Sequence, residues 1–153
     1  MRRKIRKVPD PILHELSLPI EVINGYIKEL AEEMLGILRG VRCIPCLGLA
    51  AVQLGEKVRM IAIMYNMYSS DFREPKLIIN PKIIKLPGKT VESHEGCLSI
   101  GDGTQIFTVQ RYKLVKVMGI DLNGERIVMK ERQLPAFALQ HEIDHLDGKL
   151  VSD

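Results

Sequence analysis

Two histidines near the C-terminal end of the sequence stand four residues apart, with a glutamate directly after the first. The segment reads His141-Glu142-Ile143-Asp144-His145. On a helix, residues four apart lie on one face about one turn apart, so both imidazoles can reach the same metal ion. Glu142, about 100° further round the helix than His141, can lie beside that ion. The pattern predicts a metal-dependent hydrolase with Glu142 as general acid and base, although a surface helix can also carry two exposed histidines.

A catalytic metal site of this kind needs three protein ligands and one open position. Eight residues follow His145, and none of them is histidine or glutamate. The third ligand is therefore expected upstream, where residues 95–99 read EGCLS and offer a thiolate at Cys97. Thiolates bind zinc and ferrous iron well. Taken by itself, however, a cysteine is more often a small buried apolar residue.

A third segment, residues 47–55, is rich in glycine and small side chains and reads LGLAAVQLG. Such residues let the backbone come close to a ligand or to another helix. Gln53 carries the only strong side-chain dipole in this run, and its amide is a candidate hydrogen-bond donor to an oxyanion. Without context, the segment reads as the start of a tightly packed helix.

Helices are predicted on either side of the middle of the chain. Apolar residues at three- and four-residue steps predict an amphipathic helix from Glu21 to about Leu38. A final helix that carries the histidines is predicted from about Pro135 to Leu146. Proline suits its first turn, and Gly148 suits its C-terminal end.

Strands are predicted between these two helices. Short apolar and β-branched runs bounded by turn residues indicate five of them: Val58–Met64, Leu77–Asn80, Ile83–Leu86, Leu114–Ile120 and Ile127–Met129. Asn123-Gly124, between the last two, favours a tight hairpin turn. A helix, several antiparallel strands and a final helix indicate one α+β domain over residues 1–153.

Composition is that of an ordinary globular chain. Apolar residues make up 46% and charged residues 27% of the 153 residues, and the net charge is +3. No apolar run approaches the roughly 18 residues of a membrane span, and no apolar core follows the basic N-terminus as in a secretory signal. Three cysteines, two of them in a Cys43-x-x-Cys46 pair, favour a reducing cytoplasm with free thiols over a disulfide framework.

The three segments, in this order, resemble motifs of the peptide deformylase family. Those motifs are a glycine-rich segment ending in glutamine (here residues 46–53), E-G-C-L-S (residues 95–99) and Q-H-E-x-D-H-L (residues 140–146). The opening VPDPIL, residues 8–13, also looks like the start of that family. The similarity runs from about residue 8 to residue 150. It implies a peptide deformylase-like α+β fold, with antiparallel sheets around a central metal-binding H-E-x-x-H helix.

The resemblance also implies an activity and a metal. Members of this family remove the formyl group from the N-terminal methionine of nascent polypeptides and release formate. The single divalent ion, natively Fe²⁺ in many members with Zn²⁺ or Ni²⁺ as alternatives, would be held by Cys97, His141 and His145. Gln53 and the backbone N–H of Leu98 would meet the charge that develops on the formyl oxygen. Glu95 and Asp144 are candidates to orient the histidines.

Substrate contacts are expected from three places. The peptide backbone would pair with Leu47 and Gly48 and with a strand edge near Ser93 to Glu95. The first side chain would enter a pocket on the inner face of the last helix, lined by Leu134, Phe137, Ala138 and His141.

Several residues depart from the family pattern. Cys46, Val52, Ser93 and Gln133 stand where glycine, proline, an apolar residue and glycine are usual, and the segment after Ser99 differs. These changes concern substrate contacts more than metal ligands. Two alternatives therefore stay open: a hydrolase of this fold with another acyl or amide substrate, and a non-catalytic peptide- or ribosome-binding relative.

The two ends of the chain indicate how it could contact the ribosome. The eight residues after His145 are too few for a further stable helix, so no C-terminal docking helix is expected. Weak ribosome contact would then fall to the basic residues between Arg2 and Lys7 and would weaken with salt. These residues can equally be a solvated terminus. No membrane contact and no specific nucleic acid are expected.

Overall fold

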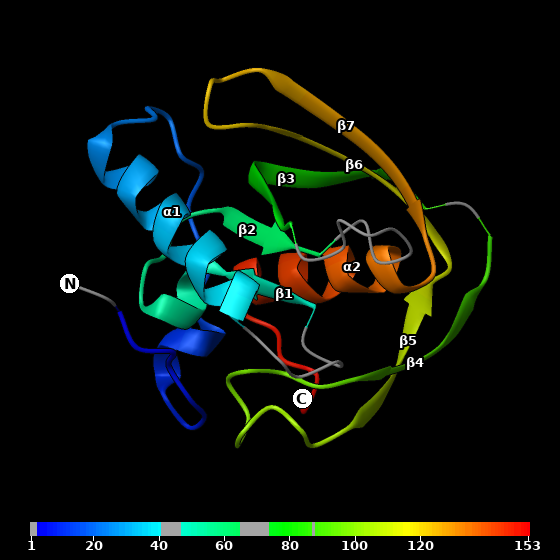
Figure 1. Cartoon of the computed structure of the whole chain (residues 1–153). Helices are drawn as coiled ribbons and strands as arrows, with labels where there is room; N and C mark the ends of the chain where they lie inside the picture. Colours follow the sequence, from blue (N-terminus) through cyan, green and yellow to red (C-terminus); the bar gives the residue numbers. More distant parts are fainter. Residues whose placement is uncertain (1–2, 41–46, 65–73, 87) are drawn as a thin grey trace.

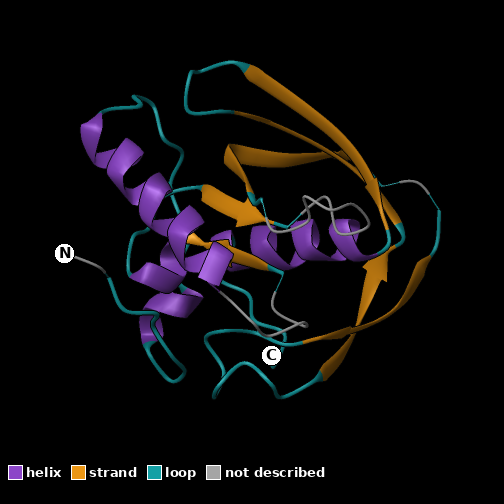
Figure 2. Cartoon of the chain, viewed as in Figure 1, coloured by secondary structure: helices purple, strands orange, loops and turns teal. Residues whose placement is uncertain are grey.

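The computed structural model of this chain describes residues 3–40, 47–64, 74–86 and 88–153. Within these ranges, antiparallel strands form one sheet in the order β1-β2-β3-β6-β7 and a second of β4 and β5. Helix α2 runs through the middle of the molecule between the two sheets, and helix α1 lies to one side (Figures 1 and 2). This arrangement confirms the predicted α+β fold around a central helix.

The elements have the following bounds. The helices are η1 (Pro11–His14), α1 (Gly25–Gly40), η2 (Ala51–Leu54) and α2 (Leu134–Leu146), where η marks a 3₁₀ helix. The strands are β1 (Gly48–Ala50), β2 (Met60–Ile63), β3 (Lys76–Lys85), β4 (Thr90–Glu95), β5 (Phe107–Tyr112), β6 (Leu114–Ile120) and β7 (Arg126–Arg132).

The five-stranded sheet separates two apolar clusters because successive side chains of a strand point to opposite faces. Met60 and Ala62 of β2 pack with the buried face of α1, whereas Ile61 and Ile63 pack with α2. Leu139 of α2 is fully buried in the second cluster. Helix α2 is thus held by core packing on its apolar side.

Helix α1 begins later than its periodicity predicts. The Asn24 carboxamide oxygen accepts a hydrogen bond from the N–H of Ile27 at 3.0 Å, which is the geometry of an N-terminal cap. The preceding residues from Glu21 are irregular. The apolar pattern continues through them because Ile20 and Ile23 still pack on the core.

Two predicted strands, Leu77–Asn80 and Ile83–Leu86, are one continuous strand, β3. Pro81 separates the two predicted segments, but it does not end the strand. The pairing of β3 with β6 shifts register between Ile79 and Lys82, and such bulges tolerate proline. Asn80 adopts a positive φ of 52°. Its side chain bonds both the N–H and the carbonyl of Ile20 at 2.8 Å, which compensates for the interrupted ladder.

The glycine-rich segment does not begin a packed α-helix. Residues Gly48–Ala50 form the edge strand β1, paired with β2, and Ala51–Leu54 form the 3₁₀ helix η2. Gly55 ends this turn with a φ of 86°, a conformation that glycine adopts without strain. The change from strand to 3₁₀ helix turns the Gln53 side chain back beside the strand, where its oxygen accepts from the Ala50 N–H at 2.8 Å.

The turn before α2 carries backbone strain. Gln133 has φ 57° and ψ −131°, a region that non-glycine residues occupy at a cost of about 1–3 kcal/mol. We expect Gln133→Gly to raise the free energy of unfolding by about 1 kcal/mol, because relief of strain exceeds the added freedom of the unfolded chain. Urea unfolding measures this change. Gln105→Gly, in an exposed loop without positive φ, is the control and should not stabilise; equal behaviour of the two variants would contradict the expectation.

Candidate metal centre and active site

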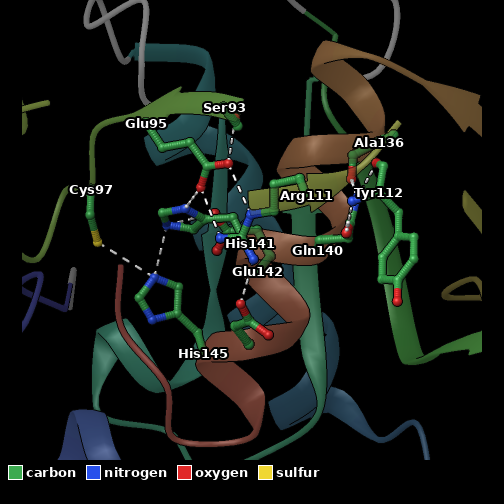
Figure 3. A network of polar contacts seen from close by, with 11 residues as sticks. Ser93, Glu95, Cys97, Arg111, Tyr112, Ala136, Gln140, His141, Glu142 and His145 are labelled. Carbon is green, nitrogen blue, oxygen red and sulfur yellow. Dashed lines mark hydrogen bonds and ion pairs between the residues drawn. The ribbon is translucent and has the colours of Figure 1, made fainter. Parts of the chain in front are cut away.

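Helix α2 presents His141 and His145 toward the turn that carries Cys97 (Figure 3). The Nε2 atoms of the two histidines lie 3.2 Å apart, and the Cys97 Sγ lies 3.5 Å from Nε2 of His145. The three ligand atoms lie within 4.8 Å of one another, and all three residues are buried. The structure therefore brings together the three residues that the sequence identified as metal ligands.

Two of the three separations fit a four-coordinate metal ion, and the third, between the ligand atoms of Cys97 and His141, lies within 4.8 Å. Metal–nitrogen bonds of about 2.0–2.1 Å and metal–sulfur bonds of about 2.3 Å place tetrahedral ligands about 3.3 Å (N to N) and about 3.6 Å (N to S) apart. The observed 3.2 and 3.5 Å match these edges. Mixed thiolate and imidazole donors are also the set that zinc and ferrous iron accept.

Glu95, the last residue of β4, holds His141 in the orientation that a ligand needs. Its Oε1 lies 2.8 Å from the Nδ1 of His141, so a proton on Nδ1 leaves the Nε2 lone pair free toward the site. Arg111 of β5 donates two hydrogen bonds to the same carboxylate, at 2.9 and 3.0 Å, and the Ser93 hydroxyl donates a third at 2.6 Å. Burial alone would raise the pKa of Glu95, but the hydrogen bonds from His141 and Arg111 outweigh it and lower that pKa to about 2.

Asp144 does not orient a histidine, contrary to the sequence prediction. Its carboxylate instead pairs with the Arg111 guanidinium at 2.6 Å. Arg111 belongs to β5, which packs against α2. Arg111 thus links β4, β5 and α2, a role that sequence reasoning missed. In the β4–β5 hairpin Glu95 pairs with Phe107, and alternate residues of β5 lie on the same face. Arg111 therefore lies on the face of Glu95 and bonds its carboxylate, which the sequence alone does not indicate.

Glu142 is buried beside the three candidate ligands, with 2% of its surface exposed. Its Oε1 lies 3.9 Å from the Nε2 of His141, and its Oε2 has no hydrogen-bond partner among the described residues. Burial raises the pKa of Glu142 to about 7, near the value that suits a general acid and base at neutral pH. A carboxylate with an unsatisfied buried oxygen at this place is suited to bind a water molecule or a substrate proton.

Gly48 lies against the side chain of Glu142. A Cβ on Gly48 would be 2.6 Å from the Cγ and 2.7 Å from the Oε1 of Glu142, closer than real contacts allow. We expect Gly48→Ala to displace this carboxylate and to lower kcat/KM at least about tenfold, since misplacement of a catalytic group by about 1 Å can cost up to 10²-fold. Metal content should not change. Gly36→Ala in α1, where a Cβ meets nothing within 4 Å, is the control; full activity of the Gly48 variant would contradict the expectation.

Gln53 is buried. Its Nε2 donates to the Ser99 hydroxyl at 3.1 Å and lies 3.8 Å from the Cys97 Sγ. The side chain is thus directed at the turn that carries the thiolate, as its proposed role requires. Leu98, in the same turn, is half-buried and packs against the cluster around α1.

The chain matches the family model described as Polypeptide deformylase over residues 2–153. Peptide deformylases of Bartonella tribocorum and Dictyoglomus thermophilum are 39% and 37% identical to it; the alignments cover 99% and 100% of this chain and 83% and 92% of theirs. The chain belongs to the peptide deformylase family. Among solved structures, the peptide deformylase from Thermotoga maritima superposes with a TM-score of 0.87 at 28% identity, covering 100% of this chain and 97% of that one. The enzyme from Legionella pneumophila gives 0.85 at 33%, covering 99% and 84%.

Membership confirms the activity predicted from the motifs. This deformylase is a metal-dependent amide hydrolase that removes the formyl group from the N-terminus of formylated nascent polypeptides. The comparisons support this activity over the two alternatives left open by the departures in sequence. None of the described helices is long and apolar enough to cross a membrane.

The residues predicted to contact the substrate differ in how exposed they are. Leu47 is half-buried against the cluster around α2, next to Gly48. Ser93 is buried and donates to Glu95, so its hydroxyl supports the charge network. On α2, Leu134 is 44% exposed, whereas Ala138 packs in the core; Phe137 between them is half-buried. Cys43 and Cys46 lie outside the described residues.

Proposed function

We propose that Cys97, His141 and His145 bind the divalent metal of this deformylase and that Glu142 is its general acid and base. The observation that carries the proposal is the convergence of three buried ligand atoms within 4.8 Å of one another, with the Glu142 carboxylate beside them. We propose Fe²⁺ as the native ion, with Zn²⁺ or Ni²⁺ able to replace it. One thiolate and two imidazoles are compatible with each of these ions.

The side chains divide the reaction between them. A divalent ion at this site supplies Lewis acidity, which lowers the pKa of water toward 7. Glu142 accepts a proton from the attacking water and delivers it to the leaving amine, so that the amine departs neutral. The Gln53 Nε2 and the Leu98 N–H donate to the formyl oxygen as its negative charge grows. Glu95 keeps the His141 ring in place throughout.

For the substrate, we propose that a formyl-methionyl chain adds to the free strand edges near the site. Strand β1 lies at one end of its sheet, and β4 pairs only with β5 among the described residues. The peptide backbone would pair with Leu47 and Gly48 on one side and near Ser93 to Glu95 on the other. The methionine side chain would lie against α2, beside Leu134, Phe137, Ala138 and His141.

We further propose that residues 1–153 act as one catalytic domain in the cytoplasm, with a weak, salt-sensitive ribosome contact at the basic N-terminus. Internal ion pairs reduce the charge available for that contact. Arg3 pairs with Glu33 and Glu56, and Arg6 pairs with Asp10. The contact should therefore be weak, and it should weaken further as salt concentration rises.

The metal and the substrate can be tested together. Purified protein should carry close to one divalent ion by elemental analysis, and the Fe²⁺ form should be the most active after removal and reloading under argon. Formyl-Met peptides should release formate, whereas acetyl-Met peptides should be cleaved at least about 10²-fold more slowly. Cleavage of both peptides at equal rates would contradict the proposed substrate, and a Zn²⁺ form faster than the Fe²⁺ form would contradict the proposed metal.

A further inference from the structure

The N-terminal segment Arg6–Val8 lies between the two parts of the chain that are proposed to contact the formyl oxygen. The N–H of Arg6 donates to the Gln53 carbonyl at 2.6 Å, and the N–H of Val8 donates to the Ser99 carbonyl at 2.8 Å. Gln53 itself reaches Ser99 through its side chain, at 3.1 Å from Nε2 to the hydroxyl. These bonds form a closed ring that connects η2, the turn after Cys97 and the N-terminal segment.

Lys7, in the middle of this segment, adds two bonds from its side chain. Its Nζ donates to the carbonyl of Leu98 at 2.7 Å and to that of Gly101 at 2.6 Å. Hydrogen bonds from a charged donor are stronger than those between neutral groups. An ammonium has three donors on a flexible stem, so it can hold two carbonyls that face one point.

The turn held by Lys7 is the one that carries the metal ligand. The N–H of Ile100 donates to the Cys97 carbonyl at 3.0 Å, and the N–H of Gly103 donates to the Ile100 carbonyl at 3.1 Å. Together with the bond from Val8, the carbonyls of Leu98, Ser99 and Gly101 therefore all accept bonds from the N-terminal segment. The peptide unit before Leu98 is held by the bond from Ile100 to the Cys97 carbonyl, and the peptide unit after Leu98 is held by the bond from Lys7.

We propose that Lys7 is a positioning residue, which holds the Cys97–Gly101 turn so that the Leu98 N–H and the Gln53 amide face the same oxygen. This inference rests on the proposed roles of Gln53 and Leu98. Among the described residues, the Lys7 ammonium bonds the carbonyls of Leu98 and Gly101 and no metal ligand, so it would act through these carbonyls. Because those donors are needed most when the oxygen carries charge, loss of Lys7 should lower kcat more than it changes KM.

The test compares Lys7→Met, Lys7→Arg and Lys4→Met in the metal-loaded enzyme. Methionine keeps the length of the side chain and removes its donors, whereas arginine restores donors. Lys4 is exposed in the same N-terminal segment, so its variant controls for the lost charge. We expect Lys7→Met to lower kcat about tenfold with KM within about twofold, Lys7→Arg to recover most of the loss, and Lys4→Met to match the parent.

Amide hydrogen exchange provides a readout that is independent of activity. In Lys7→Met the amides of Ile100 and Gly103 should exchange faster, while those of the α2 core should not. Unchanged exchange at both amides would overturn the inference, whatever the activity. Faster exchange with unaltered kcat would also overturn it, because the turn would then move without consequence for the reaction. Neither result would depend on the role of Glu142, which is tested separately.

Discussion

Replacing Glu142 with glutamine is expected to remove nearly all hydrolysis and to leave the metal in place. Glutamine keeps the size of the side chain but cannot accept a proton from water. General acid and base terms are worth roughly 10²–10⁴-fold, and this residue is proposed to serve in two proton transfers. The loss in kcat should therefore lie at the upper end of that range.

Formate release and metal analysis on the same preparation measure the two halves of this expectation. Glu92→Gln is the matched control, since Glu92 is exposed on β4 and the change removes the same charge. That variant should keep full activity. If Glu142→Gln stayed within about tenfold of the parent with metal bound, the proposed role would be wrong.

The second large effect is expected from Cys97→Ala. Three protein ligands are the minimum for a catalytic site of this geometry, so two histidines alone should hold the ion too weakly to survive dialysis. We expect metal content to fall from near one ion per chain to below about a tenth, and activity to fall with it. Elemental analysis after dialysis measures the content directly.

A suitable control for this loss is His94→Ala. His94 is exposed and contacts Thr108, away from the cluster, so its removal should not change the metal content. Full metal occupancy in the Cys97 variant would show that another group completes the site. Loss of metal in the control as well would point to a general loss of structure instead.

The parts of the site that could be predicted from sequence are those determined by residues that lie close together in the chain. The spacing of His141 and His145 puts both imidazoles on one face of a helix, and the residues that end that helix are close to it in the sequence. The turn at Asn123-Gly124 is likewise local: Gly124 has a φ of 77°, and the Asp121 carboxylate accepts hydrogen bonds from the N–H groups of Asn123 and Glu125. Each of these features depends on short-range geometry.

The parts that could not be predicted depend on pairing between distant segments. Arg111 reads as an ordinary strand residue until β5 pairs with β4 and turns it toward Glu95. Asp144 is in position to face either a histidine or that arginine, and only the packing of α2 against β5 decides between them. The continuous strand β3 was missed for a similar reason, because Asn80 is stabilised by bonds to Ile20, a partner 60 residues away.

The central position of α2 has a consequence for how this enzyme is made. The helix follows every strand in the sequence, yet it fills the space between the two sheets. Until the helix has left the ribosomal tunnel, the inner faces of β2, β6 and β7 lack their main apolar partner, and such exposed strands favour aggregation. We therefore expect a nascent chain stalled just before Leu134 to recruit chaperones, whereas one extended past Leu146 by a linker as long as the tunnel should fold.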